Sequence, residues 1–116
     1  MRTIVIVGGS KGIGNAIIKK IVEKDKVINI SRTPPDFSHA HLTHYNCDVI
    51  NDELPEIESL DSLVYCPGSI NLKPISRLNL DDFRKDFEIN VVGAVKTIQT
   101  YLNVLKKGVS PSIVLF

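Results

Sequence analysis

The sequence has few cysteines and little net charge, and its composition is that of an ordinary globular protein. Its 116 residues include two cysteines, and the acidic and basic side chains nearly cancel, which leaves a formal net charge of +1. Cys47 and Cys66 adjoin apolar stretches, so we expect reduced core thiols rather than a disulfide or a metal pair. No basic run exceeds two residues, and this disfavours a surface for nucleic acid or anionic membrane.

Long hydrophobic stretches, internal repeats and low-complexity tracts are also missing. No apolar run approaches the roughly 20 residues that a membrane-spanning helix needs, and the chain begins with a predicted strand rather than with a leader segment. With 43% hydrophobic and 23% charged residues, its length is typical of one domain. We therefore expect a single cytoplasmic domain over residues 1–116, with neither membrane nor nucleic-acid partners.

Short apolar runs alternate with helical patterns. The predicted strands are residues 4–7, 27–30, 42–47, 60–66 and 112–116. They are short and bounded by turn or helix signals, as buried parallel strands are. Helical periodicity covers residues 14–24 and 80–107, with Asn79 or Asp81 as the N-cap of the second helix and Gly108 at its end. The order favours an α/β fold with a doubly wound parallel sheet of the Rossmann type, which binds ligands at the carboxyl ends of its strands.

Two connections are unusual for such a fold. Residues 49–59 are too few for the full helix of a regular crossover, so we expect a turn or short helix that leaves one face of the sheet thinly covered. His39, His41 and His44 lie in a polar connection. No arrangement of carboxylates or cysteines completes a metal-ligand set with them, so we expect a solvated loop and no metal site.

A glycine-rich turn joins the first predicted strand to the first helical pattern. It reads Gly8, Gly9, Ser10, Lys11, Gly12, Ile13 and Gly14. Such glycines allow a tight turn and a close backbone approach, and the free N–H groups and positive dipole end of the helix face an anion. Since the lysine precedes glycine instead of serine or threonine, the turn is not a P-loop. A purely structural turn is the alternative.

This turn and three later motifs resemble those of the short-chain dehydrogenase/reductase family. The family's turn reads T-G-x-x-x-G-x-G, and only its threonine differs here, replaced by Val7. The later motifs, in the family's order, are Asp48-Val49, Cys66-Pro67-Gly68 and Asn90-Val91-Val92-Gly93. The one at Gly68 is degenerate, because only the glycine of Asn-Asn-Ala-Gly remains. The resemblance implies an oxidoreductase that interconverts a small-molecule carbonyl and an alcohol by hydride transfer with a nicotinamide dinucleotide.

The resemblance also implies a cofactor site. Its expected residues are Gly8, Ser10, Lys11, Gly12, Ile13, Gly14, Ser31, Arg32, Asp48, Val49, Cys66, Pro67, Gly68 and Asn90. In the family the aspartate contacts the adenine amino group, and the glycine after the fourth strand lets the backbone approach the ribose and nicotinamide. For Asp48, capping of a turn is the competing interpretation.

Arg32 and Lys11 indicate which dinucleotide is preferred. A carboxylate at the end of the second strand would bind the ribose 2′-hydroxyl of NAD and repel a 2′-phosphate. Arg32 stands there instead and can pair with a phosphate in bidentate geometry, while Lys11 can add a second cation. We expect NADP(H) to be preferred over NAD(H). Two solvated surface cations are the alternative.

Asn90 is the candidate catalytic residue. It lies among apolar neighbours in mid-helix, where an amide needs a bonding partner. In the family, an asparagine at this place holds a water of the proton relay and bends the helix. The family's serine and Tyr-x-x-x-Lys motif are absent, since Val49, Ser69 and Leu105 follow the three tyrosines at that spacing. We expect a cofactor-binding portion, truncated after the fifth strand, with that strand an exposed apolar edge, and inactive alone.

Two expectations concern function and assembly. A regulatory or sensor module that binds NADP without turnover is the alternative to an enzyme. The second predicted helix carries apolar residues on more than one face, and the family's corresponding helix builds a dimer interface. We therefore expect a homo-oligomer, either a dimer or a tetramer.

Overall fold

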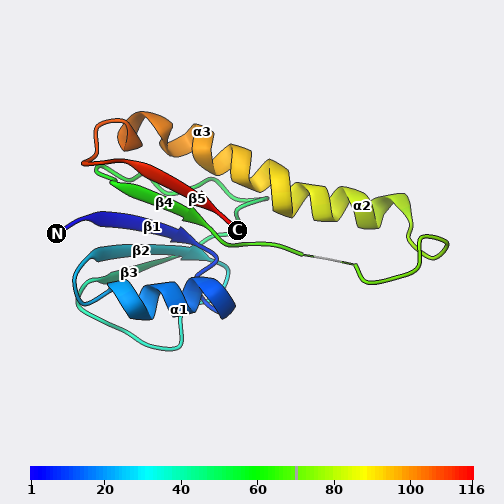
Figure 1. Ribbon diagram of the computed structural model, residues 1–116, viewed down its shortest axis with the longest axis horizontal. Helices are drawn as coiled ribbons and strands as arrows, with labels where there is room; N and C mark the ends of the chain where they lie inside the picture. Colours follow the sequence, from blue (N-terminus) through cyan, green and yellow to red (C-terminus); the bar gives the residue numbers. More distant parts are fainter. Residues whose placement is uncertain (70) are drawn as a thin grey trace.

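The computed structural model describes residues 1–69 and 71–116, which form an α/β fold on five parallel strands. The strands are β1 (Thr3–Val7), β2 (Lys26–Ser31), β3 (Leu42–Asn46), β4 (Ser62–Tyr65) and β5 (Ser112–Leu115). Their order across the sheet is β3-β2-β1-β4-β5, and every neighbouring pair is parallel. The carboxyl ends of the strands therefore lie at one edge (Figure 1).

Helices lie on both faces of this sheet (Figure 1). Helix α1 (Gly12–Ile21) packs on one face and α3 (Gly93–Leu105) on the other. A π-helical turn, η1 (Glu88–Val92), joins α3 to α2 (Leu80–Phe87). The three form one helical rod whose α2 end projects beyond the sheet (Figure 1). The predicted doubly wound architecture is confirmed.

Each face of the sheet has its own apolar core. Because alternate side chains of a strand point to opposite faces, Ile4 and Ile6 pack with Ile18 of α1, whereas Val5 and Val7 share a core with α3. The central strands β1 and β4 are buried throughout. The expectation of a buried strand is wrong for β3, because it is an edge strand with no residue fully buried. The exposed apolar edge expected at β5 is confirmed.

The connection from β3 to β4 is irregular but closely packed. Its residues 48–61 form turns and no helix, as expected. Leu54, Ile57 and Leu60 are nevertheless buried in the same core as α3, and the Tyr101 hydroxyl of α3 donates to a carbonyl of the connection at 2.7 Å. The expectation of a thinly covered face is therefore wrong, because buried aliphatic side chains take the place of the missing helix.

Helix α2 begins at a capping box. The Asn79 side chain accepts a hydrogen bond from the Asp82 N–H at 2.9 Å, and the Asp82 carboxylate accepts one from the Asn79 N–H at 3.2 Å. Asn79, and not Asp81, is thus the N-cap. Beyond α3, Gly108 has no room for a side chain, because a Cβ atom there would collide with the carbonyl of Leu60.

No helix among the described residues combines the length and the apolar character needed to cross a membrane.

Replacing the capping side chain tests the role of Asn79. Asn79→Ala is expected to lower the free energy of unfolding by about 1 kcal/mol, because the backbone N–H of Asp82 loses its hydrogen-bond acceptor. Asp81→Ala is the matched control: it removes an exposed carboxylate that pairs with Arg84 at 3.1 Å, a contact worth at most about 0.5 kcal/mol. Urea denaturation followed by circular dichroism compares the two, and equal losses would contradict this assignment.

Candidate functional site

The carboxyl ends of three strands meet around Gly8, which follows β1. Its φ of +83° lies in a region that glycine adopts readily and other residues rarely do. The ring of Pro67, which follows β4, lies 3.0 Å from where a Cβ atom of Gly8 would be. The Gly8 N–H donates to the carbonyl of Ile30 in β2 at 2.9 Å. Two of the predicted motifs, the glycine turn and the segment after β4, are therefore in contact.

The amino end of α1 has no side-chain cap among the described residues, and its first turn carries no acidic residue. Helix α2, by contrast, has a capping box and two acidic residues there. Gly12, with φ of +59°, faces open space, since no heavy atom of the described chain beyond its neighbours lies within 4 Å of where its Cβ would be. Free N–H groups at a positive helix end favour an anion.

Asn29 of β2 supports this turn from within the core, and the sequence did not predict it. Its side chain is fully buried. Its Oδ1 accepts the Gly9 N–H at 2.9 Å, and its Nδ2 donates to the Ser31 hydroxyl at 2.8 Å. A Cβ atom on Gly9 would collide with the Asn29 side chain. One amide in an otherwise apolar strand is the signal that could have identified it.

Ser31 and Arg32, at the end of β2, differ in exposure. The Ser31 hydroxyl is buried and donates to the Thr33 carbonyl at 2.6 Å. Its hydrogen-bonding capacity is used inside the protein, so a contact of this hydroxyl with a dinucleotide is disfavoured. Arg32 and Lys11 are exposed, and within the described part of the chain neither side chain forms a salt bridge.

Asp48 caps the turn that follows β3. Its Oδ1 accepts the Ile50 N–H at 2.9 Å, and its Oδ2 accepts the Asn51 side-chain amide at 3.0 Å. The bond from Ile50, with smaller contributions from Asn51 and the Arg32 charge, holds the pKa of Asp48 below its usual range. The capping interpretation is confirmed, and a contact with adenine stays a prediction. Val49 is buried and its carbonyl accepts a hydrogen bond from the Lys96 ammonium at 2.9 Å; a contact of its backbone with a cofactor stays a prediction.

Asn90 lies in η1 and binds the loop after β4. Its Oδ1 accepts the Ser69 N–H and its Nδ2 donates to the Ser69 carbonyl, both at 2.9 Å. The mid-helix amide is therefore bonded, although it is exposed rather than surrounded by apolar side chains. Gly68 lies beside it, since a Cβ atom there would be 3.2 Å from Oδ1 of Asn90. A water held by Asn90 stays a prediction.

Asp86 connects the same loop to α2 and was not predicted from the sequence. Its carboxylate accepts hydrogen bonds from the Ser69 hydroxyl and, at 3.0 Å, from the Asn71 amide. These two bonds lower the pKa of Asp86. Asp86 precedes Asn90 by four residues, so both lie on one side of the rod. That spacing of two polar residues is the signal that could have identified it.

The side chain of Tyr65, the last residue of β4, forms a hydrogen bond with the π-helical turn. The Gly93 N–H donates to the carbonyl of Glu88, five residues back, rather than to that of Ile89. The Tyr65 hydroxyl donates to this Ile89 carbonyl. Gly93 makes room for it, since a Cβ atom there would collide with the hydroxyl. Burial raises the pKa of Tyr65 to about 12.

Cys66 and two of the histidines contact other parts of the protein. The Cys66 N–H donates to the Val7 carbonyl at 2.9 Å, and burial raises the pKa of the Cys66 thiol. The expectation of a solvated loop is wrong for His44, because it lies in β3 and contacts the buried Asn29 side chain at 3.0 Å. The ring of His41 contacts the Val22 carbonyl at 2.8 Å. Among the described residues, no group of three or more metal-ligating side chains could hold a metal ion. Ser10 and Ile13 lie in the turn and at the start of α1, where their contacts with a cofactor stay predictions.

A family model described as short chain dehydrogenase matches residues 45–116. Benzil reductase ((S)-benzoin forming) of Bacillus subtilis (strain 168) is 30% identical over 116 residues, which cover 87% of this chain and 48% of that protein. A 1-hydroxy-2-glutathionyl-2-methyl-3-butene dehydrogenase of Rhodococcus sp. is 26% identical, over 98% of this chain and 56% of the relative. The chain spans about half the length of the curated relatives it matches.

Solved structures share the fold. The aldohexose dehydrogenase of Thermoplasma acidophilum, in ligand-free form, superposes with a TM-score of 0.82 at 23% identity, over 97% of this chain and 47% of that one. A short chain dehydrogenase from Leptospira borgpetersenii with bound NAD⁺ superposes with a TM-score of 0.79 at 17% identity, over 91% of this chain and 46% of that one. This likeness confirms the Rossmann-type parallel sheet.

Removing the Tyr65 hydroxyl tests its contact with the π-helical turn. At neutral pH, Tyr65→Phe is expected to lower the free energy of unfolding by about 1 kcal/mol, because the Ile89 carbonyl loses its donor. The raised pKa means that folding favours the protonated phenol. Wild-type stability should therefore fall as the pH rises from about 10, the unfolded value, toward about 12.

This alkaline loss should be smaller in Tyr65→Phe, though not abolished, because burial also raises the pKa of Tyr101. Tyr45→Phe is the control, since the Tyr45 side chain is 39% exposed. Urea unfolding at neutral pH and near pH 11 measures both effects. An alkaline loss as large in Tyr65→Phe as in the wild type would contradict the assignment.

Proposed function

The chain belongs to the short-chain dehydrogenase family, and we propose that it is the cofactor-binding portion of an NADP(H)-dependent oxidoreductase that interconverts a carbonyl and an alcohol. The observation that carries the proposal is the uncapped amino end of α1 at the carboxyl edge of the sheet. The cytoplasmic location expected from the sequence is part of the same proposal.

The residues at this edge fit a dinucleotide. The turn backbone at Gly12 is open, and the N–H groups at the start of α1 suit a pyrophosphate. Gly68 keeps the backbone after β4 free of a side chain, and Asn90 holds that backbone in place through Ser69. When bound, the dinucleotide supplies the hydride. The residues of this chain bind and orient it.

The proposed preference for NADP(H) rests on Arg32 and Lys11. Both are exposed, and no acidic residue stands in the first turn of α1. A charge-assisted hydrogen bond is worth about 1.5–3 kcal/mol, so one arginine on the 2′-phosphate would favour NADP(H) by roughly ten- to a hundredfold. Within the described part of the chain, no salt bridge occupies the Arg32 guanidinium.

A module that binds NADP without turnover is the alternative, and activity separates the two. Similarity to a benzil reductase supports a carbonyl substrate for the enzyme. The full-length protein should oxidise NADPH in the presence of some member of a panel of aromatic and aliphatic carbonyl compounds. Tight binding of NADPH without turnover on any of them would favour the sensor module.

Reversing the charge of Arg32 tests the cofactor preference. Calorimetric titration of the wild type should show tighter binding of NADPH than of NADH, and more so at low salt. Arg32→Asp should erase or invert that preference, because a carboxylate repels the 2′-phosphate. Arg77→Asp makes the same charge change at another exposed arginine and should leave the preference intact. Equal wild-type affinities for the two dinucleotides would overturn the assignment.

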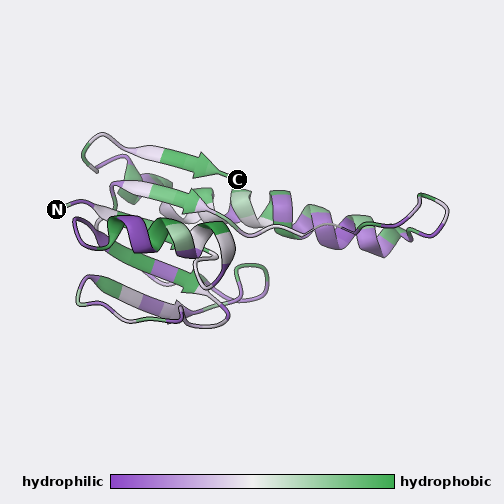
Figure 2. Ribbon diagram, turned by 60° about the horizontal axis from the view of Figure 1, so that its bottom comes forward, coloured by the Kyte–Doolittle hydropathy of each residue, from purple (hydrophilic) through white to green (hydrophobic). Residues whose placement is uncertain are grey.

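The helical rod carries a stripe of exposed apolar side chains. They are Leu80, Phe83, Phe87, Val91, Val95 and Leu102. Spacings of three, four and seven place them along one side of the rod, while Ala94, Tyr101 and Leu105 face the core. Figure 2 shows hydrophobic and hydrophilic segments alternating along the rod. We propose that a second copy of the protein packs on this stripe.

Charge on the stripe should break the assembly. Sedimentation velocity at micromolar concentration should give a dimer or tetramer for the full-length wild type and a smaller species for Phe87→Glu, because a buried unpaired carboxylate opposes association. Val109→Glu changes an exposed apolar residue outside the stripe and should not alter the mass. A wild-type protein that sediments as a monomer would rule the interface out.

A further inference from the structure

A chain of hydrogen bonds joins the glycine turn to the edge strand β3. It runs from the Gly9 N–H through the buried side chain of Asn29 to the ring of His44. We propose that Asn29 is a positioning residue for the phosphate-binding turn, and that protonation of His44 loosens this turn and weakens dinucleotide binding. The expected effect on dinucleotide binding rests on the proposed function. The coupling of His44 to Gly9 does not depend on it.

The orientation of the Asn29 amide follows from its partners. A backbone N–H can only donate, so the Asn29 atom that lies 2.9 Å from the Gly9 nitrogen is the amide oxygen. The two hydrogens of Nδ2 then point to Ser31 Oγ at 2.8 Å and to His44 Nδ1 at 3.0 Å. Ser31 gives its own hydrogen to the Thr33 carbonyl and therefore accepts from Asn29. Both amide hydrogens are used.

This arrangement fixes the state of the His44 ring. Nδ1 meets a donor, so it carries a lone pair rather than a proton. The ring proton is then on Nε2, which faces Oδ1 of Asn46. His44 is thus the neutral Nε2–H tautomer. A second proton, on Nδ1, would set two N–H groups against each other and break the bond from Asn29.

Asn29 cannot adapt without releasing the turn. If its amide rotated to offer oxygen to a protonated His44, its NH₂ group would face the Gly9 N–H, and both donors would be buried without acceptors. The side chain has no exposed surface, and even one added carbon at Gly9 would collide with it. Protonation of His44 therefore costs either its own bond to Asn29 or the bond that holds Gly9.

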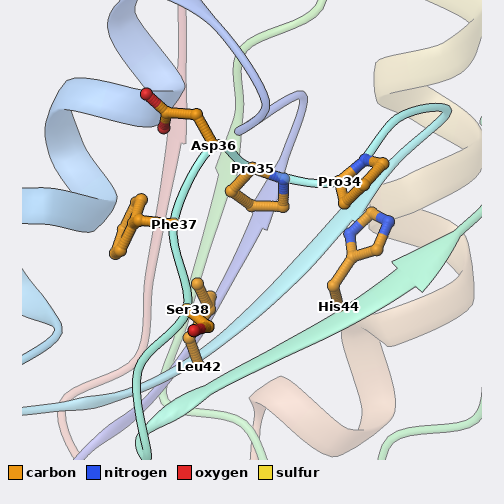
Figure 3. Close-up of a pocket in the computed structure, with 7 residues that line it drawn as sticks. All are labelled: Pro34, Pro35, Asp36, Phe37, Ser38, Leu42 and His44. Atoms are coloured by element: carbon orange, nitrogen blue, oxygen red, sulfur yellow. The ribbon is translucent and has the colours of Figure 1, made fainter.

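Solvent reaches His44 through a hollow of about 450 Å³ (Figure 3). Its lining consists of Pro34, Pro35, Asp36, Phe37, Ser38, Leu42 and His44. Asp36 is the charged group that faces this space. Its carboxylate points toward α1 (Figure 3), where it accepts from Asn15 at 3.2 Å and pairs with Lys19 at 3.4 Å. On the strand side, His44 meets the neutral amides of Asn29 and Asn46.

The test compares His44→Asn with the wild type in the full-length protein. Asparagine can place an acceptor near the position of Nδ1 but gains no proton between about pH 8 and about pH 5.5, where histidines titrate. His41→Asn is the matched control, since His41 contacts the Val22 carbonyl and not Asn29. NADP⁺ affinity is measured by calorimetry at both pH values. Protonation of the 2′-phosphate itself affects all three proteins equally.

On acidification, the wild type and His41→Asn should lose about tenfold more affinity than His44→Asn, which corresponds to one lost hydrogen bond. An equal loss in all three proteins would overturn the link between His44 and binding.

A second readout needs no ligand. Within these 116 residues, Gly9 is the only glycine that follows a glycine. Glycine labelled with ¹³C at the carbonyl and ¹⁵N at the amide therefore gives this part of the full-length protein one HNCO peak, that of Gly9. Its amide shift should titrate together with the His44 ring in the wild type and in His41→Asn, and stay constant in His44→Asn. A Gly9 shift that ignores His44 would overturn the inference. A coupled titration without NADP⁺ binding at any pH would overturn the proposed function instead.

Discussion

The architecture of this site depends on the absence of side chains in the turn between β1 and α1. A Cβ atom would press against Pro67 at Gly8, against Asn29 at Gly9, and against the Gly8 carbonyl at Gly14. Any larger residue would separate α1 from the sheet or push β1 from the segment after β4. Because close packing of this kind leaves no free volume, the glycines fix where the amino end of α1 lies.

Helices α1 and α2 differ at their amino ends. Helix α2 uses Asn79 and Asp82 to bind its first N–H groups and adds acidic charge to its first turn. Helix α1 has neither, although both devices would stabilise it. The uncapped end lies where Gly12 faces open space. The difference favours a ligand, rather than a side chain, as the partner of α1.

The loop after β4 is held by residues of the helical rod. Asn90 binds both polar backbone groups of Ser69, and Asp86 binds its hydroxyl. The rod is in turn joined to β4, because the Tyr65 hydroxyl takes the Ile89 carbonyl that the π-helical turn leaves free. Strand, loop and helix thus form one hydrogen-bonded unit opposite the glycine turn.

The sequence by itself determined the five strands, the helices, the N-cap at Asn79 or Asp81 and the glycine turn, because periodicity, capping and backbone freedom are local properties. Only the tertiary structure showed that Asn29 holds Gly9, that Asp86 and Asn90 hold Ser69, and that aliphatic side chains of residues 49–60 pack beside α3 in place of the missing crossover helix. Each of these pairs elements far apart in the chain. A polar residue shows in the sequence that it needs a partner, but only the packed sheet and helices decide which partner it meets.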